Sequence, residues 1–146
     1  MTRPVPPPPE PLHVRTGRAL AAVVHRMQNE WSEDTTFSLW QRFSAELEAA
    51  TPLTADTFRA AAGIAARRTI RRRDVDDYFS YVTDPTNFEA EVVDASVLLR
   101  DLVSVALSEP TIFKVGEGQG VNVRTFLVGR TRDGNLAGIQ APEIQT

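Results

Sequence analysis

Apolar positions along the chain follow a helical period in two long stretches. Within residues 12–31 they recur every three or four positions, which places them on one face of a helix. The same spacing recurs over residues 89–108, where Glu89, Glu91 and Asp94 lie near the N-terminal end that the helix dipole favours for acids. We therefore expect two long helices, the second ended by Glu109 and Pro110.

Shorter elements are expected between these helices. Residues 37–43 fit a short strand or a helical turn. Thr54 is suited to N-cap a short helix over residues 55–62, because its hydroxyl can accept from a free backbone amide. Asp74 can begin another short helix in the same way, whereas residues 64–73 favour no element.

The last third of the chain has the pattern of strands. We expect strands over residues 111–115, 121–129 and 136–146. Asp133 and Gly134 predict a tight hairpin turn between the last two, because Asp-Gly tolerates the positive φ that such turns need. Helices followed by neighbouring strands predict an α+β domain, with helices packed on a small, mainly antiparallel sheet that ends in a C-terminal hairpin.

The N-terminal segment differs from the rest. Residues 1–11 contain six of the ten prolines and predict an extended, disordered tail outside a domain that spans residues 12–146. A PxxP-type ligand is the alternative for this tail. We find no apolar run of an export signal at the start and none approaching the ~20 residues of a membrane span, so we expect a cytoplasmic protein without a membrane partner.

Composition narrows the possible functions. The chain has 146 residues, 16 Lys and Arg against 19 Asp and Glu, and a formal charge of −3. This balance argues against direct nucleic-acid binding, which depends on neutralising phosphates, and suits a basic partner. There is no cysteine, which excludes a disulfide scaffold, a thiolate zinc site and a cysteine nucleophile.

Few residues suggest enzymatic chemistry. The glycine run at 116–120 could be a phosphate loop of a small nucleotide binder, but a strand is expected after it where a phosphate loop needs a helix, so a hairpin turn is favoured. The arginines at 67–73 are either a solvated basic patch or a face that orients a partner. His13 and His25 have no metal-ligand spacing. We expect no enzyme, no cofactor and no metal site of its own.

Carboxylates in loops are the more informative feature. Glu30, Glu33 and Asp34 follow the first helix, and further acids flank Asn87 and Phe88. Such acids are usually ordinary loop and cap residues. They can also present negative charge to a cation or a basic groove, in which case an exposed aromatic ring at Phe88 would be the apolar contact.

Several segments resemble the nuclease A inhibitor family. The strongest is residues 125–146, with a strand, a turn containing Gly134 and Asn135, a Leu-Ala-Gly sequence and a terminal Thr146. Residues 75–80 and 83–88 resemble the family's middle helix and exposed loop. Ser32 and Glu33, followed by Phe37, Leu39 and Trp40, are a weaker match, and the whole resemblance covers about residues 15–146.

This resemblance implies an α/β/α sandwich and a protein inhibitor of a sugar-nonspecific, metal-dependent DNA/RNA endonuclease, which plugs the enzyme's active site. It also implies partner-binding roles for Thr146, for the loop residues Thr86, Asn87 and Phe88, where the family pattern is Gln-Asp-Trp, and for an acid that is Glu33 or Glu30. Thr146 and Glu33 would approach the metal of the target nuclease. The alternative is a non-enzymatic interaction module on the same scaffold that binds another basic protein.

The predicted core consists of large apolar side chains from both halves of the chain. They are Trp31, Trp40, Phe58, Phe79, Phe113 and Leu136.

Overall fold

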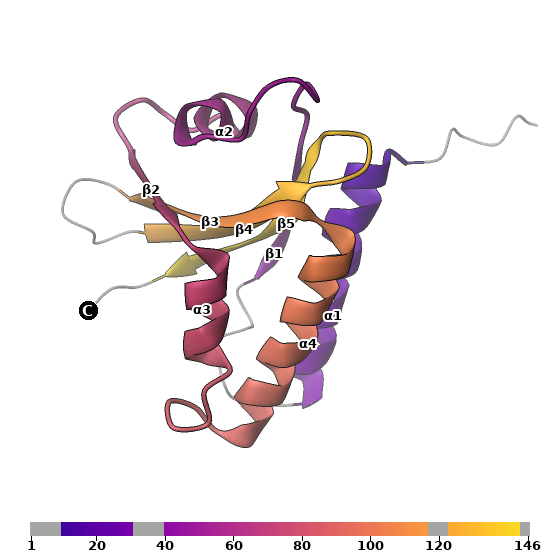
Figure 1. The fold of residues 1–146 in the computed structure, drawn as a ribbon, viewed down its shortest axis with the longest axis vertical. Helices are drawn as coiled ribbons and strands as arrows, with labels where there is room; N and C mark the ends of the chain where they lie inside the picture. Colours follow the sequence, from indigo (N-terminus) through magenta and orange to yellow (C-terminus); the bar gives the residue numbers. More distant parts are fainter. Residues whose placement is uncertain (1–9, 31–39, 117–122, 144–146) are drawn as a thin grey trace, which may run out of the picture.

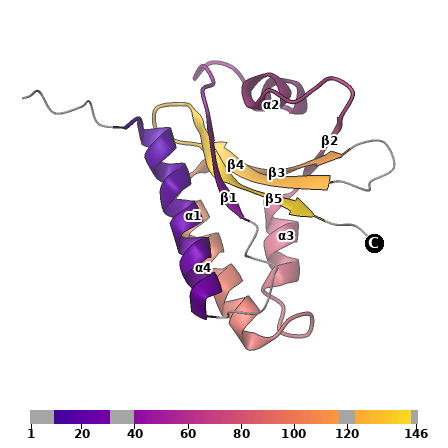
Figure 2. The ribbon, with the colours of Figure 1, turned by 180° about the vertical axis from the view of Figure 1, so that it is seen from behind.

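The computed structural model describes residues 10–30, 40–116 and 123–143. In chain order the elements are α1 (Leu12–Glu30), β1 (Gln41–Ala45), α2 (Ala55–Ala62), β2 (Thr69–Arg73), α3 (Val75–Val82), α4 (Ala90–Ala106), β3 (Ser108–Gly116), β4 (Val123–Arg130) and β5 (Leu136–Glu143). Three layers result: α2 covers one face of the sheet, and α1, α3 and α4 lie on the opposite face (Figure 1, Figure 2). The α+β fold class predicted from the sequence is confirmed.

All pairings between the described strands are antiparallel, and the strand order is β1-β5-β4-β3-β2. The β4–β5 hairpin predicted from Asp133 and Gly134 is confirmed, with Arg130 opposite Leu136. Gly134 has a φ of 85°, which is the conformation that favours glycine in such a turn. The connection from β1 to β2, which contains α2, crosses the whole sheet, whereas β2, β3, β4 and β5 follow one another as neighbours. Both edges of the sheet therefore come from the first half of the chain.

The sheet separates two apolar cores, since successive side chains of a strand point to opposite faces. Leu127 packs with α1, α3 and α4 on one face, whereas its neighbours Phe126 and Val128 pack beneath α2 on the other. Trp40, Phe58, Phe79, Phe113 and Leu136 are buried as predicted, and Trp31 lies outside the described residues.

Local capping signals explain the short helices. The Thr54 side chain accepts a hydrogen bond from the backbone N–H of Thr57, while the Thr57 hydroxyl accepts one from the backbone N–H of Thr54. Asp74 Oδ1 accepts hydrogen bonds from the backbone N–H groups of Asp76 and Asp77 at the start of α3. Both predicted N-caps are confirmed. They could be predicted because these interactions span only a few residues.

The junction of α4 and β3 differs from the prediction. The helix ends at Ala106 rather than at residue 108, and the strand begins at Ser108 rather than at residue 111. Only Leu107 separates the helix from the strand. The pairing of β3 with β4 is irregular between Ser108 and Thr111, where Glu109 has a φ of 53°. Pro110 is tolerated there because β2 pairs only with residues 112–116 of this strand.

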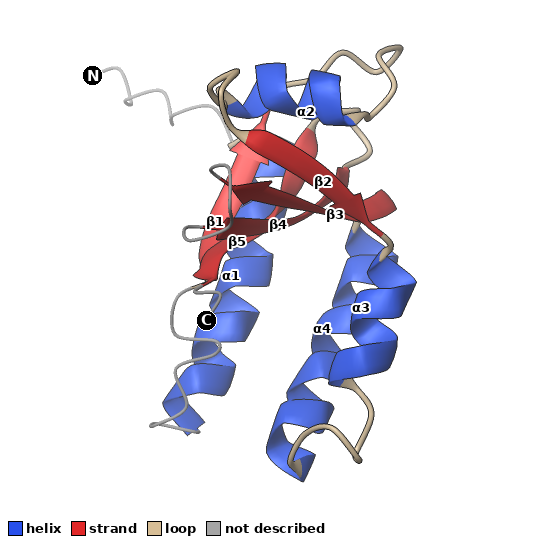
Figure 3. Ribbon diagram, turned by 90° about the vertical axis from the view of Figure 1, so that its left-hand side faces the viewer, coloured by secondary structure: helices blue, strands red, loops and turns tan. Residues whose placement is uncertain are grey.

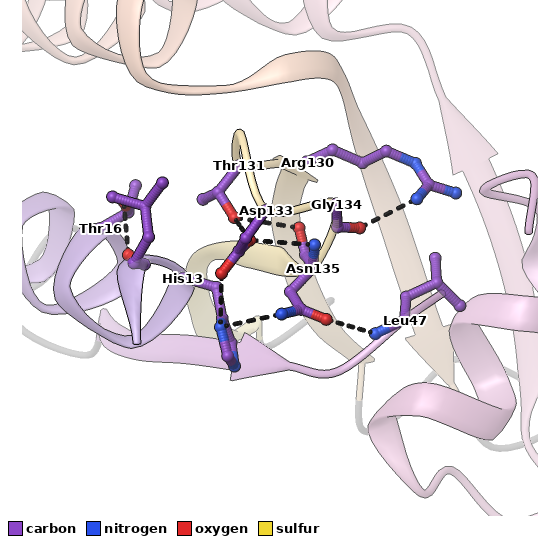
Figure 4. A network of polar contacts seen from close by, with 9 residues as sticks. His13, Thr16, Leu47, Arg130, Thr131, Asp133, Gly134 and Asn135 are labelled. Atoms are coloured by element: carbon purple, nitrogen blue, oxygen red, sulfur yellow. Dashed lines mark hydrogen bonds and ion pairs between the residues drawn. The ribbon is translucent and has the colours of Figure 1, made fainter. Parts of the chain in front are cut away.

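A polar network fastens the N-terminal end of α1 to the β4–β5 turn (Figure 4). His13, which the sequence places beside the proline-rich segment, is buried, and its Nδ1 lies 3.3 Å from both Asp133 Oδ2 and Asn135 Nδ2. Asn135 Oδ1 accepts a hydrogen bond from the backbone N–H of Leu47. Partial burial raises the pKa of Asp133, but hydrogen bonds from Thr131, Asn135 and His13 outweigh it and lower this pKa to about 2.

Candidate functional site

The exposed loop over residues 83–89 is the candidate site. It connects the C-terminal end of α3 to the N-terminal end of α4, and these two helices pack against each other beneath the sheet (Figure 3). Pro85 disfavours a helical conformation at Asp84, so α3 cannot continue into α4 and the chain reverses here. The loop is therefore presented at the end of a stiff helical pair that points away from the sheet.

Asp84 organises the loop from within. Its Oδ1 accepts hydrogen bonds from the backbone N–H of Thr86 at 2.9 Å and from the Thr86 hydroxyl at 2.7 Å. The backbone carbonyl of Asp84 accepts from the N–H groups of Asn87 and Phe88. The hydroxyl and amide of Thr86 hold the pKa of Asp84 below its ordinary value, because they stabilise the ionised carboxylate. Thr86 and Asn87 remain exposed at the tip.

Tyr81 completes the site from the last turn of α3. Its ring meets the ring of Phe88 edge-on, with centroids 5.2 Å apart and an interplanar angle of 86°. Its backbone carbonyl accepts a hydrogen bond from Asn87 Nδ2 at 3.2 Å. Tyr81 is 59% exposed, whereas Phe88 is only partly exposed. The apolar contact surface of the loop is thus an aromatic pair, and sequence reasoning missed its more exposed member.

Strong negative charge surrounds this loop. Residues 74–106, which comprise α3, the loop and α4, contain eight carboxylate side chains and one cation, Arg100. Seven of the eight carboxylates are exposed, and Asp84 is partly exposed. The net charge of −3 for the whole chain hides this concentration, because five arginines at positions 67–73 immediately precede it in the sequence. A count of charge by segment, rather than for the whole chain, would have shown it.

The structure brings together Thr86, Asn87 and Phe88, three of the five residues predicted to bind a partner. Glu33 and Thr146 lie outside the described residues, and the side chain of Glu30 is not described either. The C-terminal end of α1, from which the segment with Glu33 continues, lies at the same end of the helical layer as the N-terminal end of α4 (Figure 1).

The alternative sites have ordinary structural explanations in the described part of the chain. β3 and β4, which flank the glycine run, pair directly with each other, and no helix follows the run; residues 117–122 themselves are not described. The arginines at 71–73 belong to β2, an edge strand, where Arg72 Nε donates a hydrogen bond to Thr111 Oγ1 at 3.1 Å. The geometry thus disfavours the nucleotide-binding hypothesis.

Within the described residues no group of three or more His, Asp or Glu side chains is placed to hold a metal ion. Over the same residues, no helix combines the length and the apolar character that a membrane span needs.

The fold and the site together define a layered α+β domain that presents an acidic helical pair and its connecting loop. Residues 24–146, most of the chain, match the family described as nuclease A inhibitor-like protein. The chain belongs to this family, as the resemblance in the sequence predicted, and membership suggests a role in nuclease inhibition rather than in catalysis. No curated protein matches the chain.

Proposed function

We propose that this protein inhibits a sugar-nonspecific, metal-dependent endonuclease by plugging its active site. The observation that carries the proposal is the exposed loop at residues 83–89, held rigidly within an acidic helical pair, in a chain that belongs to the nuclease A inhibitor-like family. A groove that binds polyphosphate is basic, so it attracts a surface of this charge. A loop ordered before binding also loses little conformational entropy on docking.

Three parts of the chain have distinct roles in this mechanism. The Thr146 carboxylate and Glu33, with Glu30 as the alternative acid, approach the hard divalent cation of the nuclease, for which carboxylate oxygens are suitable ligands. Thr86, Asn87 and Phe88 contact the protein surface around that cation. The nuclease supplies the metal.

The environment of Asn87 supports a contact role rather than a charged one. Its amide nitrogen donates to the carbonyl of Tyr81, and an ionised aspartate could not donate this bond. Asn87 therefore ties the loop to the last turn of α3, beside the Tyr81–Phe88 pair. Aromatic rings of this kind are frequent centres of binding energy in protein interfaces.

Inhibition of DNA cleavage tests the proposal. The protein is titrated into a ββα-metal endonuclease from the same genome, and the inhibition constant is measured. Removal of Thr146 should weaken inhibition at least 100-fold, because it withdraws the terminal carboxylate from the metal. Thr146→Ser is the matched control, since it keeps both the chain length and the carboxylate. Equal potency of the truncated and full-length chains would refute the plugging mechanism.

The aromatic pair has its own test. Phe88→Ala and Tyr81→Ala should each weaken inhibition by about 10- to 100-fold, as truncation of an aromatic contact at an interface does. Tyr78→Phe, in the same helix but outside the loop, is the control for a general effect on α3. If Phe88→Ala and Tyr81→Ala both inhibit as well as the parent, the aromatic pair is not part of the interface.

A second function follows from the departures at the loop tip, where Asn87 and Phe88 replace the Asp-Trp of the family pattern. On this alternative the same scaffold binds another basic protein. Affinity capture with the full chain would then recover a basic partner without nuclease activity, and the purified chain would leave nuclease cleavage unchanged.

A further inference from the structure

The outward face of α4 carries apolar and acidic side chains in one row. Asp94, Leu98, Asp101 and Val105 are spaced by four, three and four residues, so they lie on one side of the helix. The opposite side, with Leu99 and Val103, is buried against the sheet and α1. All four members of the outward row are exposed, Leu98 by 48% and Val105 by 87%.

These side chains are unusual on a solvated helix. Among the described residues, the large apolar side chains that are exposed are Tyr81, Leu98 and Val105, and all three belong to α3 or α4. A helix that faces only water has no need of leucine and valine on its outer side. The exposed apolar groups and the excess of carboxylates thus coincide on one part of the molecule, which is typical of a surface that meets a partner.

We propose that this outward face of α4 is a second docking surface, which binds the positively charged rim of the nuclease groove beside the plugged active site. The inference rests on the proposed function. The row begins one turn beyond the loop at residues 83–89 and continues away from it, so one partner can contact both. From Glu91 to Val105 the face is about 21 Å long, a length that a protein interface can cover.

The chemistry of the row gives each residue type a different effect. Asp94 and Asp101, with Glu91 nearby, attract a cationic surface over distances of about a Debye length, and this accelerates association. Arg100 Nη2 lies 3.3 Å from Asp101 Oδ1 and offsets one of these three negative charges, so the face keeps a net charge of about −2. Leu98 and Val105 act after contact, because burial of apolar surface slows dissociation.

Association and dissociation rates with the same endonuclease test the proposal. Asp94→Asn combined with Asp101→Asn should lower the association rate about 3- to 10-fold at low ionic strength, with the difference largely lost at high salt. Val105→Ser should raise the dissociation rate about 3-fold or more and leave the melting temperature unchanged, because the side chain is almost fully exposed. Glu48→Gln combined with Asp56→Asn is the matched control, because it removes the same charge from exposed positions outside α1, α3 and α4.

The outcomes separate the two proposals. If the endonuclease is inhibited but the α4 variants and the control change the rates equally, the second docking surface is refuted while the plug stands. If no endonuclease binds at all, the proposed function fails first. If the chain instead self-associates and Val105→Ser abolishes that association, the occupant of this face is a second copy of the chain and the proposal is overturned.

Discussion

Phe58→Ala tests whether stability and partner binding reside on opposite faces of the sheet. The Phe58 side chain in α2 has no exposed surface. Its ring stacks on that of Phe113, with centroids 4.3 Å apart and planes 9° from parallel. The rings of Phe126 and Phe43 lie 5.1 Å and 5.8 Å away. Four phenylalanines thus form the centre of the core beneath α2.

The expected loss of stability in Phe58→Ala follows from this environment. Truncation of a buried phenylalanine to alanine costs about 3–5 kcal/mol, since it removes buried apolar surface and leaves a cavity. Phe58 lies at the upper part of this range, because it contacts three other rings and each aromatic pair adds about 0.5–1.5 kcal/mol. We expect a loss of about 4–5 kcal/mol in the free energy of unfolding. For a chain of this size, that lowers the melting temperature by about 12–20 °C.

Urea denaturation monitored by circular dichroism measures this loss, and Phe58→Leu is the control. Leucine keeps an apolar side chain and should lose only about 1–2 kcal/mol. At a temperature where Phe58→Ala remains folded, it should inhibit the endonuclease as the parent does, because α2 lies across the sheet from the loop at residues 83–89 (Figure 1). A loss below 1 kcal/mol would refute the assignment of this core, and loss of inhibition by the folded variant would refute the separation of faces.

Three further substitutions test the scaffold. Asp133→Asn should lower the free energy of unfolding by about 1 kcal/mol at pH 7, a value discounted for the 31% exposure of the side chain. Because the pKa of Asp133 is lowered in the folded protein, this stabilisation is complete above the ordinary pKa of 3.8 and disappears as the pH falls towards about 2. Urea titrations at several pH values would follow it. Thr54→Ala should lower the free energy of unfolding by about 1 kcal/mol, because it removes the capping box, whereas Thr54→Ser should keep most of this stability. Gly138→Ala should prevent folding at 25 °C, because a Cβ there would overlap the backbone carbonyl of Leu127; soluble expression and circular dichroism would show this, and a stable variant would contradict the close approach of β4 and β5.

Elements whose signals are local could be predicted from the sequence. The bounds of α2 were predicted correctly, since Thr54 and Gly63 mark its two ends within one short stretch. β2 was not predicted, because its residues contain three arginines and no alternation of apolar and polar positions. It becomes a strand through pairing with β3, about 40 residues later in the chain, and such non-local pairing leaves no local pattern.

The same distinction applies to the candidate site. The loop at residues 83–88 and the acids that flank it directly were visible in the sequence, because Pro85 and these acids are local features. The Tyr81–Phe88 pair was not, since it depends on how the chain reverses after α3. The exposure of Leu98 was also hidden, because an apolar residue in a helix predicts burial. Only the packing of α4 shows that, among the residues that the structure describes, its outer side is left uncovered.

The arginines of β2 have a consequence for the behaviour of the protein at high concentration. β2 is an edge strand, so its outer backbone groups are available to a strand of another molecule. Two copies that joined through this edge would bring Arg71, Arg72 and Arg73 of one molecule against the same residues of the other, and the like charges would repel. The strand thereby resists growth of the sheet into fibrils, which keeps the domain available in its folded form.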